Sequence, residues 1–223
     1  MCSSDLSESF VYDGTRLACA QMLRAGITCF GDMCFFPRAA ARAACDTGAR
    51  AVLGLIVQES ATPCASDADD YLHRGLAVRD ECADEPLLRF ALAPLGTRIS
   101  DRTLQRVAMF ADELDVPLHA HVHECRSEVE LSMRDHRARP LQRLSALGVL
   151  RAGTVAIHGV ELDAGDIELL AQHGCSVAIC PACSLRRGSC IAPIAALLAA
   201  NVNIGLDRKS TRLNSSHITI SYA

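Results

Sequence analysis

The chain of 223 residues is short of the features that mark several large classes of protein. No apolar run reaches the roughly 20 residues that a membrane-spanning helix needs, and no signal peptide opens the chain. We therefore expect a soluble, cytoplasmic protein with no membrane partner. The formal net charge is −4, and no basic stripe is present that could follow a phosphate backbone. A nucleic-acid partner is therefore not expected either.

Motifs for nucleotide phosphates and for disulfide scaffolds are missing as well. There is no Gly-x-Gly-x-x-Gly and no P-loop. The 12 cysteines are scattered through apolar runs without regular spacing, which favours small buried hydrophobic side chains over a disulfide framework. The one CxxC motif, Cys180-Pro-Ala-Cys183, could be half of a zinc site or a redox pair. No second such motif and no thioredoxin-like context accompany it.

Lysine is almost absent, and its single position helps to show where the composition of the chain changes. It occurs at Lys209, whereas arginine is frequent from Arg16 to Arg187. From Asp207 onward the composition turns rich in serine and threonine. Residues 1–6 and 207–223 both resemble translated sequencing-library adapter. We expect an adapter-derived leader and a disordered adapter-derived tail around residues 7–206, and Asp207 is then not a metal ligand.

Between these ends, short apolar runs alternate with longer amphipathic ones. Strands are predicted at 27–33, 51–57, 87–94, 117–123, 154–159, 176–181 and 201–206, with helices between them. Because the strands are mostly apolar, both of their faces should be covered. The pattern fits either a (β/α)₈ barrel or a doubly wound parallel sheet. A full barrel has eight strands and takes about 250 residues, so the seven strands predicted here are one too few.

Three histidines stand at every second position of the fourth predicted strand. They are His119, His121 and His123, and Glu124 follows them directly. Alternation with period two places the three imidazoles on one face of the strand. Imidazoles beside a carboxylate suit a divalent metal and a proton shuttle, whereas the plainer interpretation is a polar face of solvated histidines. All three cannot reach one metal, because alternate residues lie about 6.5–7 Å apart along a strand.

Other polar residues also lie at the carboxyl ends of predicted strands. Asp32 ends the first strand, His158 the fifth and Cys180 the sixth. A barrel places its active site at that end of its strands. The sequence therefore predicts that these positions and the histidine strand share one face of the fold.

Several stretches together resemble the amidohydrolase superfamily, in its branch of cytosine, triazine and 5-methylthioadenosine/S-adenosylhomocysteine deaminases. The matching stretches are Gly31–Pro37, His119–Glu124, Ala156–His158, Cys180–Pro181 and 191–206. The resemblance implies an α/β fold, namely an incomplete (β/α)₈ TIM barrel of the metal-dependent hydrolase type that lacks strand 1 and the end of strand 8. Those strands carry the family's His-x-His and aspartate ligands.

The resemblance also implies roles for particular side chains. His121 is the ligand of one divalent ion, Zn²⁺ or Fe²⁺, and Glu124 is the general acid and base. His158 sits beside the metal and its water, where it orients the water or stabilises the tetrahedral intermediate. His123 is placed in the substrate pocket, and His119 lies deeper as a supporting or core histidine. The reaction implied is hydrolytic deamination of a small heterocyclic amine, such as an adenosine-type nucleoside, an aminopurine, a pyrimidine or a triazine.

Two stretches depart from the nucleoside deaminases of this branch and leave the substrate open. Pro94 is followed by Leu95-Gly-Thr-Arg98 rather than by histidine, and Ala182-Cys-Ser184 replaces Glu-Ser-Asn. The other class of zinc deaminases is disfavoured, because its His-x-Glu and Pro-Cys-x-x-Cys motifs are both absent. The remaining alternative is a non-catalytic barrel fragment or binding module, inactive as written because metal ligands are missing. A full-length protein could form a homo-oligomer.

Overall fold

The computed structural model of the chain describes residues 7–95 and 99–206. The expected adapter-derived leader and tail, and residues 96–98 of the stretch after Pro94, lie outside the described residues. The chain divides into two compact units, with the boundary between Ala93 and Pro94. No helix in the described ranges is both long enough and apolar enough to cross a membrane.

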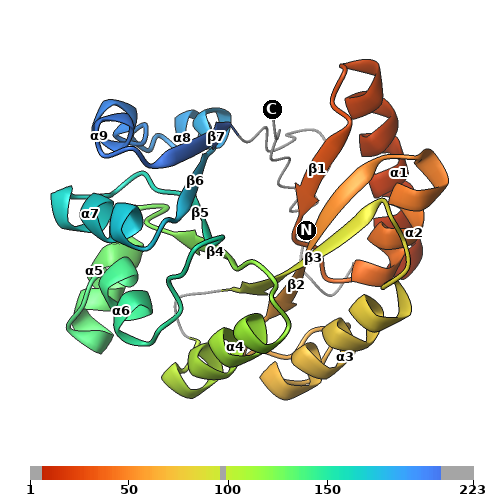
Figure 1. The fold of residues 1–223 in the computed structure, drawn as a ribbon, viewed down its shortest axis with the longest axis horizontal. Coiled ribbons are helices and arrows are strands. Elements are labelled where there is room, and N and C mark those ends of the chain that lie inside the picture. Colours follow the sequence, from red (N-terminus) through yellow and green to blue (C-terminus); the bar gives the residue numbers. More distant parts are fainter. Residues whose placement is uncertain (1–6, 96–98, 207–223) are drawn as a thin grey trace. The chain divides into compact units, whose positions relative to one another are not determined.

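The N-terminal unit is a three-stranded sheet with helices packed against it. It contains α1 (Glu8–Arg24), β1 (Cys29–Asp32), α2 (Pro37–Thr47), β2 (Arg50–Val57), α3 (Ala68–Glu81) and β3 (Leu88–Pro94). The strand order is β1-β2-β3, and β1 pairs with β2 in parallel. Helices α2 and α3 pack on β2, and α1 packs on α2 (Figure 1).

Local capping residues set where the helices of this unit begin and end. The Ser7 hydroxyl accepts the N–H of Phe10 at the start of α1, and the Asp67 carboxylate accepts the N–H of Asp70 at the start of α3. Each such cap satisfies one of the N–H groups that have no partner inside the helix. Helix α2 ends at Gly48, whose φ of 70° lies in the left-handed region that glycine adopts without strain.

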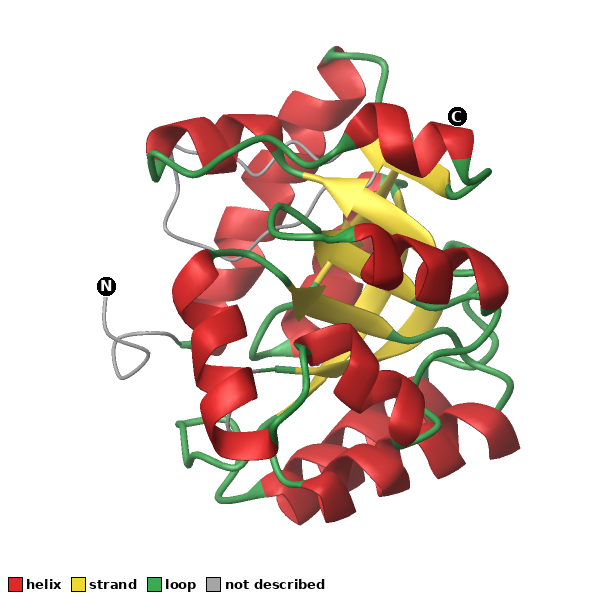
Figure 2. Ribbon diagram, turned by 90° about the vertical axis from the view of Figure 1, so that its left-hand side faces the viewer, coloured by secondary structure: helices red, strands yellow, loops and turns green. Residues whose placement is uncertain are grey.

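The C-terminal unit carries a four-stranded, fully parallel sheet in the order β4-β5-β6-β7 (Figure 1). Figure 2 shows the strands in yellow and the helices in red. Its elements are α4 (Asp101–Glu113), β4 (His119–Val122), α5 (Arg126–His136), α6 (Pro140–Ala146), β5 (Val155–His158), α7 (Ala164–Gln172), β6 (Ser176–Ile179), α8 (Pro181–Arg186), α9 (Ile194–Ala199) and β7 (Asn203–Leu206). All seven predicted strands are therefore present in the described ranges. Helix α8 was not predicted.

Aliphatic side chains fill the space between each sheet and its helices. Leu53 and Leu92 are fully buried in the N-terminal unit, and Leu118, Ile157 and Leu170 are fully buried in the C-terminal unit. Full burial of one such side chain stabilises the folded state by about 1.5–3 kcal/mol. Strands β4 and β5 pair side by side within this packed unit, and the candidate site lies at the ends of these two strands.

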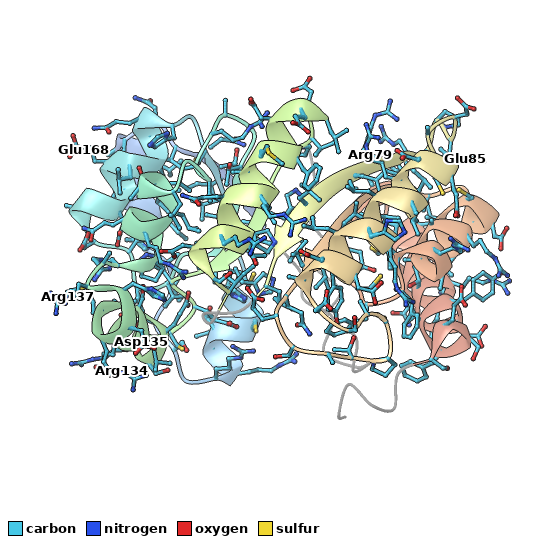
Figure 3. All side chains as sticks on the ribbon, turned by 90° about the horizontal axis from the view of Figure 1, so that it is seen from below. Arg79, Glu85, Arg134, Asp135, Arg137 and Glu168 are labelled. Atoms are coloured by element: carbon cyan, nitrogen blue, oxygen red, sulfur yellow. The ribbon has the colours of Figure 1, made fainter. Side chains whose placement is uncertain are left out.

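Charged side chains lie on the outer surfaces of the helices. Arg134, Asp135 and Arg137 project outward from the end of α5 (Figure 3). The ion pair between Arg134 and Asp135 is largely exposed, so it adds little to stability. The cysteines of the described ranges form no disulfide. Among these cysteines only Cys19, Cys34, Cys175 and Cys180 are buried, so the expectation that most cysteines are buried side chains is wrong.

Candidate active site

Three chemistry-bearing side chains converge at the carboxyl ends of β4 and β5. They are His121, Glu124 and His158, called the His–Glu–His group below, and one donor atom of each lies within 4.8 Å of the others. The two imidazole centroids are 5.1 Å apart, and their planes meet at 83°. Atom Nε2 of His158 lies 3.2 Å from Oε1 of Glu124. The predicted convergence of these three residues is therefore present in the C-terminal unit.

The pairing of β4 with β5 brings these residues together. Val122 stands opposite His158 in the parallel register, so both strands end at the same level. The backbone of His158 has a φ of 80°, in the left-handed region, which costs a non-glycine residue about 1–3 kcal/mol. The next residue holds this conformation, because the N–H of Gly159 donates to the carbonyl of Val122 at 3.2 Å. Such strain is typical of functional positions.

The environment of the group combines burial with access to solvent. The His158 side chain is 1% exposed, whereas the Glu124 carboxylate is 23% exposed. His121 is half-buried. A carboxylate that reaches solvent while contacting a buried imidazole can exchange protons with water and with a bound molecule, as a general acid and base must.

Arg187 is a member of the site that the sequence analysis missed. It is the C-cap of α8, and its guanidinium contacts Oε1 of Glu124 directly, the same oxygen that faces His158. The Arg187 side chain remains 52% exposed. The available signal was the pair Arg186–Arg187 shortly after the strand end at Cys180. Arginine pairs are so common on helix surfaces that the signal was not specific.

His123 does not share a face with His121, which corrects the expectation from alternation. The alternation ends with β4 at Val122, and the backbone of His123 turns into the left-handed region, with a φ of 55°. Its ring is fully buried. Nε2 accepts the N–H of Leu141 at 3.3 Å, and Nδ1 lies 3.1 Å from the carbonyl oxygen of Glu161. The ring therefore lies between α6 and the segment before α7, and its Nε2 is also 3.6 Å from Oδ1 of Asp166 in α7, rather than beside the His–Glu–His group.

His119 lies deeper along β4, as expected for a supporting or core histidine. Its side chain is 1% exposed, and its Nε2 atom has no hydrogen-bond partner among the described residues. Burial lowers the pKa of His119 to about 4. The ring is therefore neutral near pH 7.

Glu128, in the first turn of α5, supports the loop that carries Glu124. Its Oε2 atom accepts the backbone N–H of Glu124 at 2.7 Å. Burial raises the pKa of Glu128 to about 7, and the hydrogen bond from the backbone N–H of Glu124 opposes that rise. A half-buried carboxylate thus holds the peptide group of Glu124.

The donor chemistry of the His–Glu–His group fits a divalent metal ion. Two imidazole nitrogens and one carboxylate oxygen form a set that zinc and iron(II) accept. Bonds of about 2.0–2.2 Å to one ion would draw the three donors slightly closer together than they stand here. Among the described residues, this is the only group of at least three histidine, cysteine or acidic side chains with donors so close.

A larger cavity lies elsewhere, in the N-terminal unit, and belongs to a different part of the chain. It measures about 340 Å³ and is lined by side chains that include Cys34, Phe36, Cys64 and Tyr71. None of the predicted site residues lines it. Cavity size alone would therefore point away from the side chains that can carry chemistry.

Comparison with known proteins identifies the family. The sequence model of the amidohydrolase family matches residues 2–215. The 5-methylthioadenosine/S-adenosylhomocysteine deaminase of Teredinibacter turnerae is 40% identical over 210 residues, which cover 94% of this chain and 48% of that protein. The 5'-deoxyadenosine deaminase of Methanothrix thermoacetophila is 31% identical over 212 residues, covering 95% of this chain and 50% of that protein. The chain spans about half the length of these curated relatives.

Solved structures show the same fold. An adenosine deaminase from Xanthomonas campestris with bound zinc superimposes with a TM-score of 0.88 at 37% identity, over 92% of this chain and 47% of that one. Atrazine chlorohydrolase from Arthrobacter aurescens, also complexed with zinc, gives a TM-score of 0.82 at 23% identity, over 90% of this chain and 49% of that one. The fold is therefore an incomplete (β/α)₈ barrel of the metal-dependent hydrolases, and the doubly wound alternative is set aside.

Proposed function

The chain belongs to the amidohydrolase family, and on that premise we propose that it is part of a metal-dependent enzyme that hydrolytically deaminates an amino-substituted heterocycle. The observation that carries the proposal is the convergence of His121, Glu124 and His158 at the ends of two paired strands. The deaminase names of the relatives support the reaction class.

Each member of the group has a distinct proposed role. His121 contributes a ligand to one divalent ion, for which we propose zinc, because zinc is bound in similar structures. A bound zinc ion would supply a nucleophilic water near neutral pH. Glu124 takes one proton from the attacking water and delivers it to a ring nitrogen, and then moves the second proton from the new hydroxyl group to the amine, which leaves as ammonia. His158 holds Glu124 and donates to the oxygen that becomes negative in the tetrahedral intermediate.

The position of His123 changes its proposed role. With its ring buried among α6 and α7, it acts on the reaction through the backbone of Glu124 rather than by touching substrate. Arg187 takes a place at the Glu124 carboxylate instead. The residues Ala182-Cys-Ser184, which replace Glu-Ser-Asn, lie in α8, where the Ser184 hydroxyl donates to the carbonyl of Cys180 at 3.2 Å.

The substrate proposed is a small heterocyclic amine, with an adenosine-type nucleoside as the first candidate. The relatives in Teredinibacter turnerae and Methanothrix thermoacetophila carry the names of deaminases for such nucleosides. An aminopurine, a pyrimidine or a triazine remains the second group of candidates. We propose a cytoplasmic location and homo-oligomerisation for the whole protein as parts of the same hypothesis.

The proposal is tested on a full-length protein that contains this segment. Its reading frame should encode a His-x-His motif upstream and an aspartate after the last barrel strand. Ammonia release is then measured from 5-methylthioadenosine, S-adenosylhomocysteine, guanine and a triazine, after metal removal and after zinc is restored. We expect zinc-dependent release from at least one compound. A Glu124→Gln variant should lose about 10²–10⁴-fold in rate.

A matched control separates catalysis from folding in that experiment. Glu130 lies on the exposed side of α5, paired with Arg126. Glu130→Gln should leave the rate unchanged. A reading frame without His-x-His, or equal rates for Glu124→Gln and Glu130→Gln, would contradict the proposed function and favour a binding module.

A further inference from the structure

The loop between β4 and α5 is fastened on both sides of Glu124. On one side, the carboxylate of Glu128 accepts the N–H of Glu124 itself at 2.7 Å. A single side chain thus fixes the orientation of the peptide group from which Glu124 projects.

On the other side, the ring of His123 anchors the residue before Glu124. Its Nε2 accepts from Leu141, the second residue of α6, and its Nδ1 faces the carbonyl of Glu161. The carbonyl of His123 accepts from the N–H groups of Val160 and Glu161, at 2.8 and 3.1 Å. The start of the loop is therefore held by segments outside α5, so Glu128 is needed only for the part that carries the carboxylate.

The rigid backbone has a consequence for the direction of the Glu124 side chain. The Oε1 atom reaches Nε2 of His158 at 3.2 Å across the strand ends. A change of the peptide orientation at residue 124 would move this oxygen away from His158. The glutamate carboxylate lies three bonds from the Cα atom, so a small rotation of the backbone displaces it by a larger distance. Proton transfer depends on hydrogen-bond reach, so a misplacement of about 1 Å costs up to about 100-fold in rate.

We propose that Glu128 is a positioning residue, which aims the carboxylate of Glu124 at His158 by fixing the peptide group at residue 124. This inference rests on the proposed function, since it assigns Glu128 a purpose in the same reaction centre. Glu128 lines the same small cavity as His121, but its hydrogen bond goes to the backbone of Glu124. The proposed action of Glu128 runs through that hydrogen bond.

The surroundings of Glu128 determine which substitutions are informative. Its side chain lines a cavity of about 50 Å³ together with Ser132, Pro140 and Arg143. Truncation to alanine would enlarge that cavity and destabilise the fold. Glu128→Met keeps the length of the side chain and removes the acceptor oxygens, whereas Glu128→Gln keeps one acceptor oxygen without the charge. Glu130→Met, on the exposed side of the same helix, is the matched control.

The first measurement follows zinc binding at the His–Glu–His group itself. The imidazole NMR signals of His121 and His158 are recorded in this chain as the concentration of free zinc is raised. Zinc that binds to cysteine thiols does not shift these signals directly, so it does not enter the measured affinity. Glu124→Gln and Glu128→Met should each weaken binding by about tenfold, as loss of an orienting partner typically does. Glu128→Gln should restore most of the loss, and Glu130→Met should have no effect.

A double-variant cycle shows whether Glu128 acts through Glu124. In the Glu124→Gln background, Glu128→Met should weaken zinc binding no further, because its proposed route to the site has been removed. An equal weakening in both backgrounds would overturn the inference and show a general structural role. Unchanged zinc binding in the Glu128→Met variant would overturn it as well.

A second measurement decides the inference even if the group binds no zinc. Hydrogen exchange of the Glu124 amide should be about tenfold faster or more in Glu128→Met than in Glu130→Met, with rescue by Glu128→Gln. If exchange at Glu124 does not change, the inference is wrong whatever zinc does. By contrast, if His121→Ala and His158→Ala leave zinc binding unchanged, the proposed function fails. The hydrogen-exchange result at Glu124 is then still decisive for the role of Glu128.

Discussion

Oε1 of Glu124 lies 3.2 Å from Nε2 of His158, although the two residues belong to different strand ends. Glu124 follows β4 by two positions, and His158 is the last residue of β5. The parallel register of these strands brings the two side chains to one level, and the left-handed backbone of His158 is maintained there. The contact therefore depends on the sheet, on the loop after β4 and on a strained residue together.

Removal of the Arg187 charge should strengthen metal binding at the His–Glu–His group. The guanidinium contacts the Glu124 carboxylate and therefore repels a divalent cation at the same place. For charges about 5 Å apart in a water-like dielectric, the repulsion corresponds to about a tenfold change in the dissociation constant. The Arg187→Gln variant is compared with Arg186→Gln by zinc titration of the imidazole signals.

Salt provides the control for that prediction. The gain from Arg187→Gln should shrink at 1 M salt, where the Debye length is only about 3 Å. If Arg186→Gln strengthens binding equally, the general charge of α8 is responsible rather than the contact with Glu124.

The free energy of unfolding should depend on pH through His119. Burial lowers the pKa of this histidine to about 4 in the folded chain, from 6.5. The unfolded chain therefore binds the proton more readily between pH 6.5 and pH 4, so stability is lost as the pH falls through this window. The loss amounts to about 3 kcal/mol for this shift.

Urea unfolding at pH 7 and pH 5 measures this dependence. His119→Gln should flatten the change in unfolding free energy between the two values, whereas His136→Gln, exposed at the end of α5, should not. An unchanged slope in His119→Gln would show that the ring is reached by water.

Glu128 should give a pH dependence of the opposite sign. Burial raises its folded-state pKa to about 7, so the folded chain holds the proton more tightly than the unfolded chain between pH 4.5 and pH 7. Stability from this group is therefore lost as the pH rises through that window. Because the side chain is only half-buried, about 1–2 kcal/mol is expected. Glu128→Gln should remove this slope, and Glu130→Gln should keep it.

The ion pair of Arg139 and Asp166 should matter more for stability than the exposed pairs. Asp166 is fully buried, and its Oδ2 atom lies 2.7 Å from Nη2 of Arg139. Asp166→Asn removes the buried partner of the guanidinium and leaves only the half-exposed Asp163, 3.0 Å from Nε of Arg139. Loss of one partner from a buried ion pair typically costs about 3–5 kcal/mol. Asp112→Asn is the matched control, because the Asp112 side chain is 86% exposed in its pair with Arg151. A similar small loss in both variants would contradict the prediction.

Much of the fold and of the site could be predicted from the sequence because both rest on local patterns. Apolar runs of strand length gave all seven strands, and the interval from His121 to Glu124 placed a histidine and a carboxylate at one strand end. His158 could be predicted for the same reason, since it ends a strand that neighbours β4.

The failures have physical causes. Alternation could not place His123, because the strand ends at Val122 and the backbone turns into the left-handed region. Helix α8 has six residues and no side-chain cap, so no periodic signal marked it, and Arg187 was missed with it. Glu128 was missed because it contacts a backbone N–H group, and sequence spacing carries no information about such a partner.

X-ray absorption of zinc bound to this chain tests the central claim most directly. Zinc held by the His–Glu–His group should show a first shell of nitrogen and oxygen at about 2.0–2.2 Å, and this shell should disappear in a His121→Ala/His158→Ala variant. A shell made only of sulfur at about 2.3 Å, unchanged in that variant, would place the metal on cysteines and contradict a metal site at His121 with Glu124 and His158 beside it.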